Sequence, residues 1–166
     1  MVTRQFLLAG VMVVLIAGVS SAQGRPDFSG TWLEDESRRK SPYTAASGGG
    51  ARAISAKDVP TVITQSADSI TIERNFMEHV RHVHHFDERE DKNRNGAQVH
   101  TTRTRWEGAR LVTEGITFQS TSQGETYWKV REVRALTPKG ELAVETTRID
   151  ENGEARTVYQ VYRRRG

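Results

Sequence analysis

All five histidines of the 166-residue chain lie close together, at His79, His82, His84, His85 and His100. Imidazole nitrogens are common protein ligands for zinc and copper. In an extended strand over residues 76–87, alternation places His82 and His84 on the same face. A hairpin centred near residue 92 sets His84 opposite His100, with His82 diagonal to it. The spacing therefore makes His82, His84 and His100 candidate ligands for a zinc or copper ion.

Other interpretations of the same histidines stay open. A register shift of one residue pairs His85 with His100 and leaves two clusters of two imidazoles. The residues also suit the solvent-exposed face of a strand. A third interpretation is a surface that gains positive charge as the pH falls through the ordinary imidazole pKa of ~6.5. Apart from a zinc or copper ion, we expect no cofactor.

Two pairs of cations suggest a different chemistry, the binding of an anion. Arg103 and Arg105 share one face of an expected strand, and so do Lys129 and Arg131. A charge buried without a partner is unfavourable, so an inward-facing arginine implies an anionic ligand or a paired glutamate. Outward and solvated side chains are the alternative for both pairs.

Aromatic side chains add candidates for the wall of a cavity. Trp106 and Trp128 lie on expected strands, where packing in the core is the alternative role. Together with the first pair of cations, they give a candidate ligand-binding set of Arg103, Arg105, Trp106 and Trp128.

The elements that must position these residues are β-strands almost throughout. Segments rich in Val, Ile, Thr, Tyr, Phe and Trp recur between Gly, Asn, Asp and Pro residues. Short connections such as Asp150-Glu151-Asn152-Gly153 carry the residues that tight hairpins require. Nine strands are expected, over 28–34, 60–65, 69–75, 76–87, 97–107, 110–119, 125–136, 140–149 and 154–164.

Strands joined by short loops pair antiparallel with their sequence neighbours, which makes a meander. A meander of this length exposes two edges unless it closes. The predicted fold is therefore all-β, an antiparallel up-and-down barrel of 8–10 strands. The segment 37–58 interrupts it with a long, flexible Ser/Ala/Gly-rich loop, either a surface excursion or a lid, in which 51–57 is a weak helix candidate.

The first 22 residues have the parts of a secretory signal. Arg4 precedes an uncharged run from Phe6 to Val19, and Ser20-Ser21-Ala22 offers small residues for cleavage. The run is shorter than the ~20 residues that span a bilayer. We expect a signal peptide over 1–22 and a single domain over 23–166, secreted or periplasmic, with no stable membrane span after cleavage.

Composition narrows the functional classes. The chain has no cysteine, which removes disulfides, thiolate chemistry and cysteine-based zinc sites. Its formal net charge of +3 is spread among alternating acidic and basic residues, so a nucleic-acid partner is not expected. No nucleophile elbow, phosphate loop, dinucleotide fingerprint or His-Glu-x-x-His motif is present.

Gly30-Thr31-Trp32 resembles the Gly-x-Trp signature of lipocalins and related calycins. The resemblance implies that Gly30 and Trp32 lie at the base of the barrel and that an arginine of the last strand packs across the indole. Arg163 is the expected arginine, or Arg164 if the register differs. Together with the segments 104–112 and 136–142, the motif resembles small exported bacterial proteins with a lipocalin-like domain.

Three functions follow from these observations. The first is an exported protein that holds a small apolar or amphipathic molecule in the barrel. The second is a metal-binding protein that uses the histidine cluster. The third is an enzyme acting on a lipid-like substrate, which the sequence favours less because no catalytic group can be assigned.

Overall fold

A computed structural model describes residues 24–42, 59–76 and 78–166. Its regular structure is almost entirely β, with one 3-10 turn (η1) near the start. The elements are β1 (Gly30–Glu34), η1 (Glu36–Arg38), β2 (Thr61–Gln65), β3 (Ser69–Phe76), β4 (Glu78–His85), β5 (Asp91–Asn95), β6 (Gln98–Glu107), β7 (Arg110–Thr121), β8 (Gly124–Leu136), β9 (Leu142–Ile149) and β10 (Ala155–Arg164).

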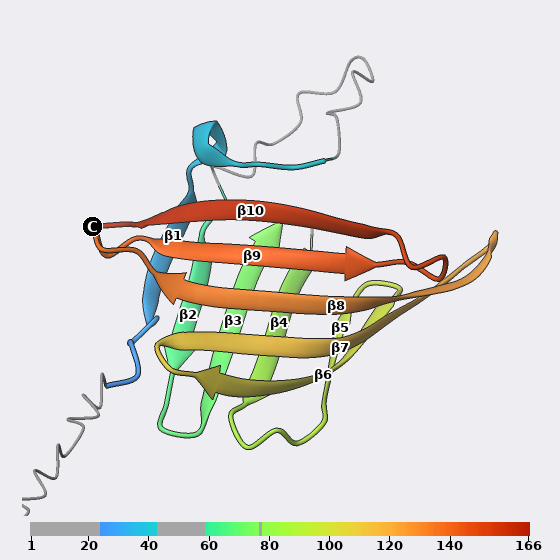
Figure 1. Ribbon diagram of the computed structural model, residues 1–166, viewed down its shortest axis with the longest axis horizontal. Helices are drawn as coiled ribbons and strands as arrows, with labels where there is room; N and C mark the ends of the chain where they lie inside the picture. The colour runs from blue at the N-terminus through green and yellow to red at the C-terminus, as the bar shows by residue number, and fades with distance from the viewer. Residues whose placement is uncertain (1–23, 43–58, 77) are drawn as a thin grey trace, which may run out of the picture.

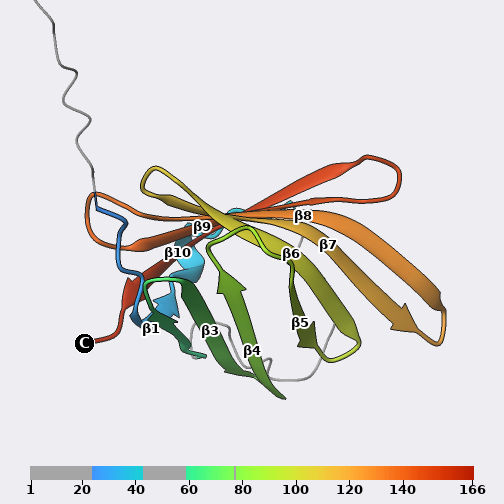
Figure 2. The same ribbon diagram turned by 90° about the horizontal axis from the view of Figure 1, so that it is seen from below.

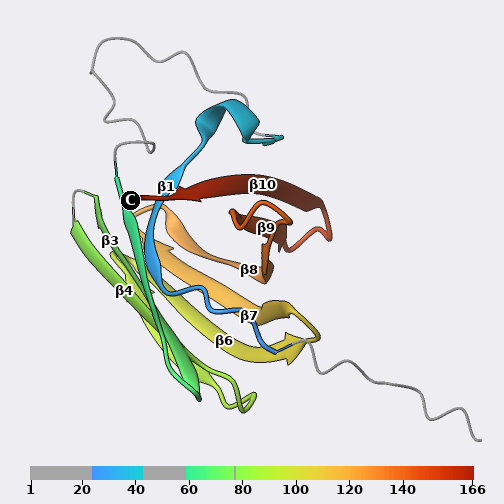
Figure 3. The same cartoon turned by 90° about the vertical axis from the view of Figure 1, so that its left-hand side faces the viewer.

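The strands form one antiparallel sheet in the order β4-β3-β2-β1-β10-β9-β8-β7-β6-β5 (Figure 1). Apart from the pairing of β1 with β10, each strand is bonded to a neighbour in sequence, as expected for a meander. The sheet curves until β3 and β4 lie across from β7 and β8 (Figures 2 and 3). The predicted all-β, up-and-down barrel of 8–10 strands is therefore confirmed.

One strand was not expected from the sequence. β5 reads Asp-Lys-Asn-Arg-Asn and has no apolar residue that would mark it as a strand. It forms because Gly96, at a φ of +54°, turns the chain so that Asn93 pairs with His100 of β6. The hairpin expected near residue 92 is therefore centred on Gly96 instead, and β5 lies between β4 and β6.

β4 and β5 are the two edges of the sheet, and side chains hold them together in place of a backbone ladder. Asn93 accepts a hydrogen bond from the Val83 backbone N–H at 2.8 Å and donates one to the Val83 carbonyl at 2.9 Å. Asp91 accepts from the backbone N–H of His85 at 2.7 Å and contacts its Nδ1 at 2.7 Å. These contacts close the barrel, so the edges are covered without strand pairing.

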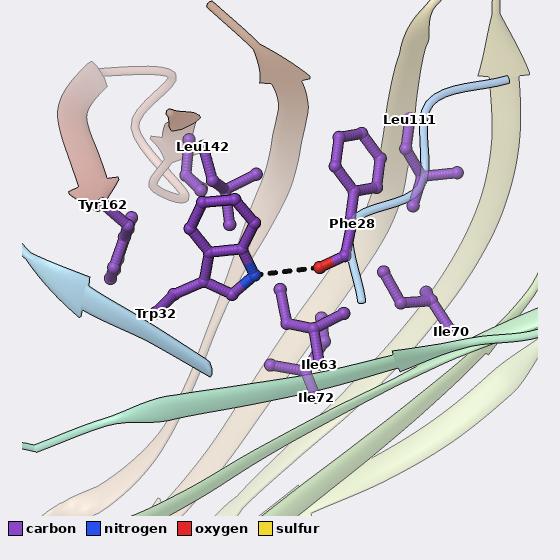
Figure 4. Close-up of a cluster of buried hydrophobic side chains, with 9 residues drawn as sticks. Phe28, Trp32, Ile63, Ile70, Ile72, Leu111, Leu142 and Tyr162 are labelled. Atoms are coloured by element: carbon purple, nitrogen blue, oxygen red, sulfur yellow. Dashed lines mark hydrogen bonds between the residues drawn. The ribbon is translucent and has the colours of Figure 1, made fainter. Parts of the chain in front are cut away.

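The apolar core fills one end of the barrel, which we call the base. Trp32 and Phe28 are fully buried there among aliphatic side chains of β2, β3, β7 and β9 (Figure 4). The indole Nε1 of Trp32 donates to the Phe28 carbonyl at 2.9 Å. The ring of Phe28 in turn stacks on Trp106, with centroids 5.6 Å apart. The segment before β1 therefore seals the base.

The glycine and tryptophan of the Gly-x-Trp motif act together with Arg164. Its guanidinium lies 4.6 Å from the Trp32 ring centroid and donates to the Ser29 carbonyl at 2.6 Å. Gly30 adopts a φ of +140°, and a Cβ there would lie 2.5 Å from Arg164 Nη1. Arg163 was the expected partner, but the register pairs it with Leu33 on the other face, where it contacts Asp35 at 3.0 Å.

Some of the sequence-based predictions concern segments that the structure describes only in part or not at all. The signal peptide over 1–22 and the helix candidate at 51–57 lie outside the described residues. Of the expected loop over 37–58, the described start contains the end of η1 and an isolated bridge from Lys40 to Tyr159. This start is therefore fastened to β10.

We predict that Asn93→Ala destabilises the barrel by about 1–3 kcal/mol, because both backbone groups of Val83 lose their hydrogen bonds. Chemical denaturation measures the free energy of unfolding. Lys92→Ala is the matched control, since Lys92 is exposed one position away on the same strand. Equal stability of the two variants would show that the side-chain bonds do not hold the β4–β5 edge.

Candidate functional site

The half of the barrel beyond the base is hollow. A cavity of about 770 Å³ is lined by residues of every strand except β7, and a smaller one of about 370 Å³ adjoins it. The two share Arg74, Arg134, Arg148 and Tyr162 in their walls. The larger volume lies in the range of ~300–1,000 Å³ that is typical of small-molecule sites.

Strand alternation makes the wall of this cavity polar. At the base the inward positions are apolar, whereas the same face of each strand becomes Thr, Arg, Glu or His toward the opposite end. On β3, for example, Ile70 and Ile72 precede Arg74. Aliphatic surface remains at Ile72 and Val80. The cavity thus has both apolar surface and fixed charges, which suits an amphipathic molecule.

Arg74 is held in place by neutral groups. Its Nε donates to Thr61 Oγ1 and its Nη2 donates to the Tyr162 hydroxyl, both at 2.8 Å. The guanidinium also lies 5.7 Å from the Tyr162 ring centroid. Burial raises the pKa of Tyr162, so this hydroxyl is uncharged at neutral pH. No carboxylate of the described residues pairs with Arg74, and its positive charge is uncompensated.

Arg134 lies deeper, with only 7% of its surface exposed. Its Nη2 forms an ion pair with Glu132, which also accepts a hydrogen bond from Thr146 at 3.3 Å. Its Nη1 is buried and has no hydrogen-bond partner within the part of the chain described. Arg134 therefore retains an unused donor in the wall of the cavity.

Arg148 and Trp128 lie together on β9 and β8. The guanidinium is 5.4 Å from the ring centroid of Trp128, and it also lines the cavity. Arg148 forms no ion pair with a carboxylate in the described ranges. On β1, two strands away from β9, the buried Glu34 has Arg39 3.7 Å away. The wall shared by the two cavities thus contains three arginines and a single carboxylate, Glu132.

The three histidines proposed as metal ligands do come together. The ring centroids of His82 and His100 are 5.0 Å apart, and those of His82 and His84 are 6.2 Å apart. His84 is buried and lies 3.4 Å from Thr102 Oγ1, while His100 Nδ1 lies 2.8 Å from Thr117 Oγ1. Even so, no group of three or more His, Cys, Asp or Glu residues among those described is arranged to hold a metal ion.

Burial keeps these imidazoles neutral. Desolvation, followed by the charge of His100, lowers the pKa of His82 to about 4. Desolvation and then Arg134 lower the pKa of His84 to about 3. Burial and the nearby Arg148 also lower the pKa of His100. A general base works best with a pKa near the working pH, so His82 and His84 are poorly suited to that role at neutral pH.

The structure separates the four candidate ligand-binding residues. Arg103 and Arg105 point to the outer face of β6, where Arg105 forms ion pairs with Glu107 and Glu114. Trp106 packs in the base, between Phe28 and Phe86. Only Trp128 lies near the cavity, beside Arg148. Lys129 and Arg131, the other cation pair, also occupy outward positions of β8.

Sequence reasoning did not single out Arg74, Arg134, Arg148 or Tyr162. A signal for the three arginines is present in the strand pattern. Arg74 lies two residues after Ile72 on β3, and Arg134 lies two residues before Leu136 on β8. Arg148 lies four residues after Val144 on β9, so each arginine shares a face with residues of the core. An arginine in phase with buried aliphatic residues indicates an inward charge, whereas Arg103 and Arg105 alternate with Thr104 and Trp106.

The comparisons with known proteins place the fold. The sequence matches no known protein family and no curated protein. Two solved structures resemble the barrel. The zebrafish ileal bile acid-binding protein complexed with cholic acid has a TM-score of 0.57 and 16% identity, over 83% of this chain and 98% of that one. The fatty acid transporter REP1-NXSQ has a TM-score of 0.54 and 14% identity, over 83% and 96%.

The protein therefore has a lipocalin-like fold, an antiparallel β-barrel of ten strands with a sealed base and a charged internal cavity. Within the described ranges, no helix has the length and hydropathy needed to cross a membrane.

We predict that stability falls as the pH drops from ~6.5 toward 3–4. Unfolded histidines bind protons near ~6.5, whereas folded His82 and His84 bind them only near 4 and 3. The folded state therefore binds fewer protons, and its stability, complete above ~6.5, is lost across this window. Thermal melting against pH measures the effect. His84→Gln should flatten the profile, and the exposed His79→Gln should leave it unchanged.

Proposed function

We propose that this protein is an exported binding protein that holds a small amphipathic molecule with an anionic group inside its barrel. The observation that carries the proposal is Arg74, a cavity-lining guanidinium that neutral groups position and no described carboxylate neutralises. Arg74 is exposed in the cavity wall, so its positive charge attracts an anion and its guanidinium is accessible to one.

The surroundings of Arg74 fit a carboxylate or a similar oxyanion. Guanidinium groups present several donors in a fixed plane, and hydrogen bonds between charged groups are stronger than those between neutral groups. The Tyr162 hydroxyl and the free Nη1 of Arg134 line the same cavity. Glu132 repels an anion from one side, but its charge is already paired with Arg134.

The aliphatic lining of the two cavities favours a ligand that is partly apolar beyond its anionic group. Ile72 and Val80 contribute aliphatic surface to the larger cavity, and Ile63, Leu142 and Val144 contribute to the smaller one. A cavity of about 770 Å³ accommodates a fatty acid or a steroid acid. The two structural neighbours are named for bile-acid binding and fatty-acid transport, which supports the same chemical class.

Export rests on the sequence of residues 1–22, with its charged start, apolar run and small residues before Gln23. We infer that the processed chain begins at Gln23 and works in the periplasm or outside the cell, as in the small exported bacterial proteins that it resembles. Such a carrier would hold an amphipath in solution.

We predict that Arg74→Gln lowers the affinity for stearate and cholate by about ten- to a hundredfold, the value of one hydrogen bond to a charged group. Isothermal titration calorimetry measures the affinities, and circular dichroism checks the fold. Arg74 is preferred to Arg134 for this test because its removal leaves no carboxylate unpaired. The methyl esters of both acids should bind wild type and variant equally.

Arg103→Gln is the control, because this arginine is exposed on the outer face of the barrel. It should leave the affinity for both acids unchanged. If the wild-type protein binds neither acid, the proposed function is wrong. An equal loss for acid and ester would mean that Arg74 shapes the cavity without recognising charge.

We predict that expression in an exporting bacterial host yields a chain cleaved between Ala22 and Gln23. Intact-mass measurement of the periplasmic fraction checks this, with Ala22→Asp as the uncleaved control. Recovery of the full chain from the cytoplasm alone would contradict the proposed export.

A further inference from the structure

The cavity has a second polar point where His82, on the strand next to that of Arg74, meets His100. His82 comes from β4 and His100 from β6, and their ring centroids are 5.0 Å apart. Both side chains line the larger cavity. The Nε2 atoms of both rings are buried and lack a hydrogen-bond partner within the described residues. Buried polar atoms are rarely left in this state, so two together call for an explanation.

The protonation state of these rings limits what can satisfy them. Burial lowers the pKa of both imidazoles, so each is neutral at neutral pH and has one nitrogen that donates and one that accepts. For His100, Nδ1 already lies 2.8 Å from Thr117 Oγ1. The hydroxyl of Thr117 can donate or accept, so the contact leaves Nε2 of His100 free to take the complementary role.

A hydroxyl group matches this pair better than the other groups of an amphipath. It is uncharged and both donates and accepts a hydrogen bond, whichever tautomers the two rings adopt. A carboxylate only accepts, and an alkyl chain leaves both nitrogens unsatisfied.

We infer that the ligand is a hydroxylated amphipathic acid, whose carboxylate lies near Arg74 and whose hydroxyl group binds His82 and His100. This inference rests on the proposed function and adds a substrate class to it. Two polar contacts, one at Arg74 of β3 and one between β4 and β6, fix the orientation of the molecule in the barrel. A simple fatty acid has no hydroxyl group and makes only the contact with Arg74, so the histidine contact distinguishes the two kinds of ligand.

The experiment compares matched acids with and without hydroxyl groups. Calorimetric titrations use 12-hydroxystearate against stearate, and cholate against 5β-cholanate. Of the two hydroxylated acids, the one that wild-type protein prefers should bind at least tenfold more tightly than the matched acid without hydroxyl groups. The variant His82→Phe/His100→Phe should reduce that preference to below twofold and keep its affinity for stearate. His79→Phe, on the exposed part of β4, should retain the preference.

Nitrogen-15 NMR of the imidazoles gives a readout that does not depend on the double variant being folded. Adding the preferred hydroxylated acid to wild-type protein should shift the Nε2 resonances of His82 and His100 but not that of His79. Shifts of equal size with the unhydroxylated acid would show that water or ring packing, not a ligand hydroxyl, satisfies these nitrogens, and would overturn the inference.

The remaining outcomes separate the two proposals. Equal affinity of the wild-type protein for hydroxylated and unhydroxylated acids overturns the substrate class and leaves the binding function standing. A preference that persists in His82→Phe/His100→Phe assigns hydroxyl recognition to other residues and also overturns it. A wild-type protein that binds none of the four acids overturns the proposed function itself.

Discussion

The packing of the base is the constraint on which the rest of the barrel depends. Trp32, Phe28 and Trp106 fill one end, and Arg164 covers the outer side of the Trp32 ring. Large rings buried in one place supply most of the apolar burial. Because the apolar core of the described residues lies at this end, the inward positions of the other half need not be apolar, and charged residues are tolerated there.

The charged inward positions reduce the apolar burial that stabilises the barrel. Its closure is also weaker, because side-chain hydrogen bonds join β4 and β5 in place of a backbone ladder. A barrel closed by a full backbone ladder has no edges, whereas this one relies on Asn93 and Asp91. His82 and His84 lie on β4, at the edge that these two residues hold, and their neutral state depends on burial. The integrity of the edge and the protonation of the cavity wall are thus linked: opening the edge exposes the imidazoles, and charging the imidazoles favours opening.

The sequence was sufficient for the fold because strand alternation and turn residues are local signals. Nine of the strands lie close to their expected ranges, and the Gly-x-Trp motif identified the base. β5 was missed because its polar residues carry no alternation, and its formation depends on pairing with β6. The choice between Arg163 and Arg164 required the register of β1 with β10, which side-chain pattern alone does not determine.

The candidate site was harder to predict, since it depends on which face of each strand is inward. His82, His84 and His100 lie close together, but His82 and not His84 lies next to His100, because β5 replaces the direct hairpin that was expected. Arg103 and Arg105 were chosen for their spacing, and both face outward. The arginines that line the cavity are single residues in phase with the core. A buried charge is unfavourable unless something compensates for it, so an arginine in phase with aliphatic residues is the informative exception in such a pattern.

The polar groups of the cavity also argue that its ligand is specific. An apolar cavity accepts many hydrophobic molecules with similar affinity, because hydrophobic contacts have no direction. Arg74, Arg134 and the His82–His100 pair each require a partner of defined charge or hydrogen-bonding capacity. A molecule without a group to match Arg134 or the His82–His100 pair leaves buried polar atoms unsatisfied, and such mismatches discriminate more strongly than a missing methylene. With the proposed function, the barrel would select by the position of polar groups along an amphipath, and the aliphatic wall would provide affinity that is common to all of them.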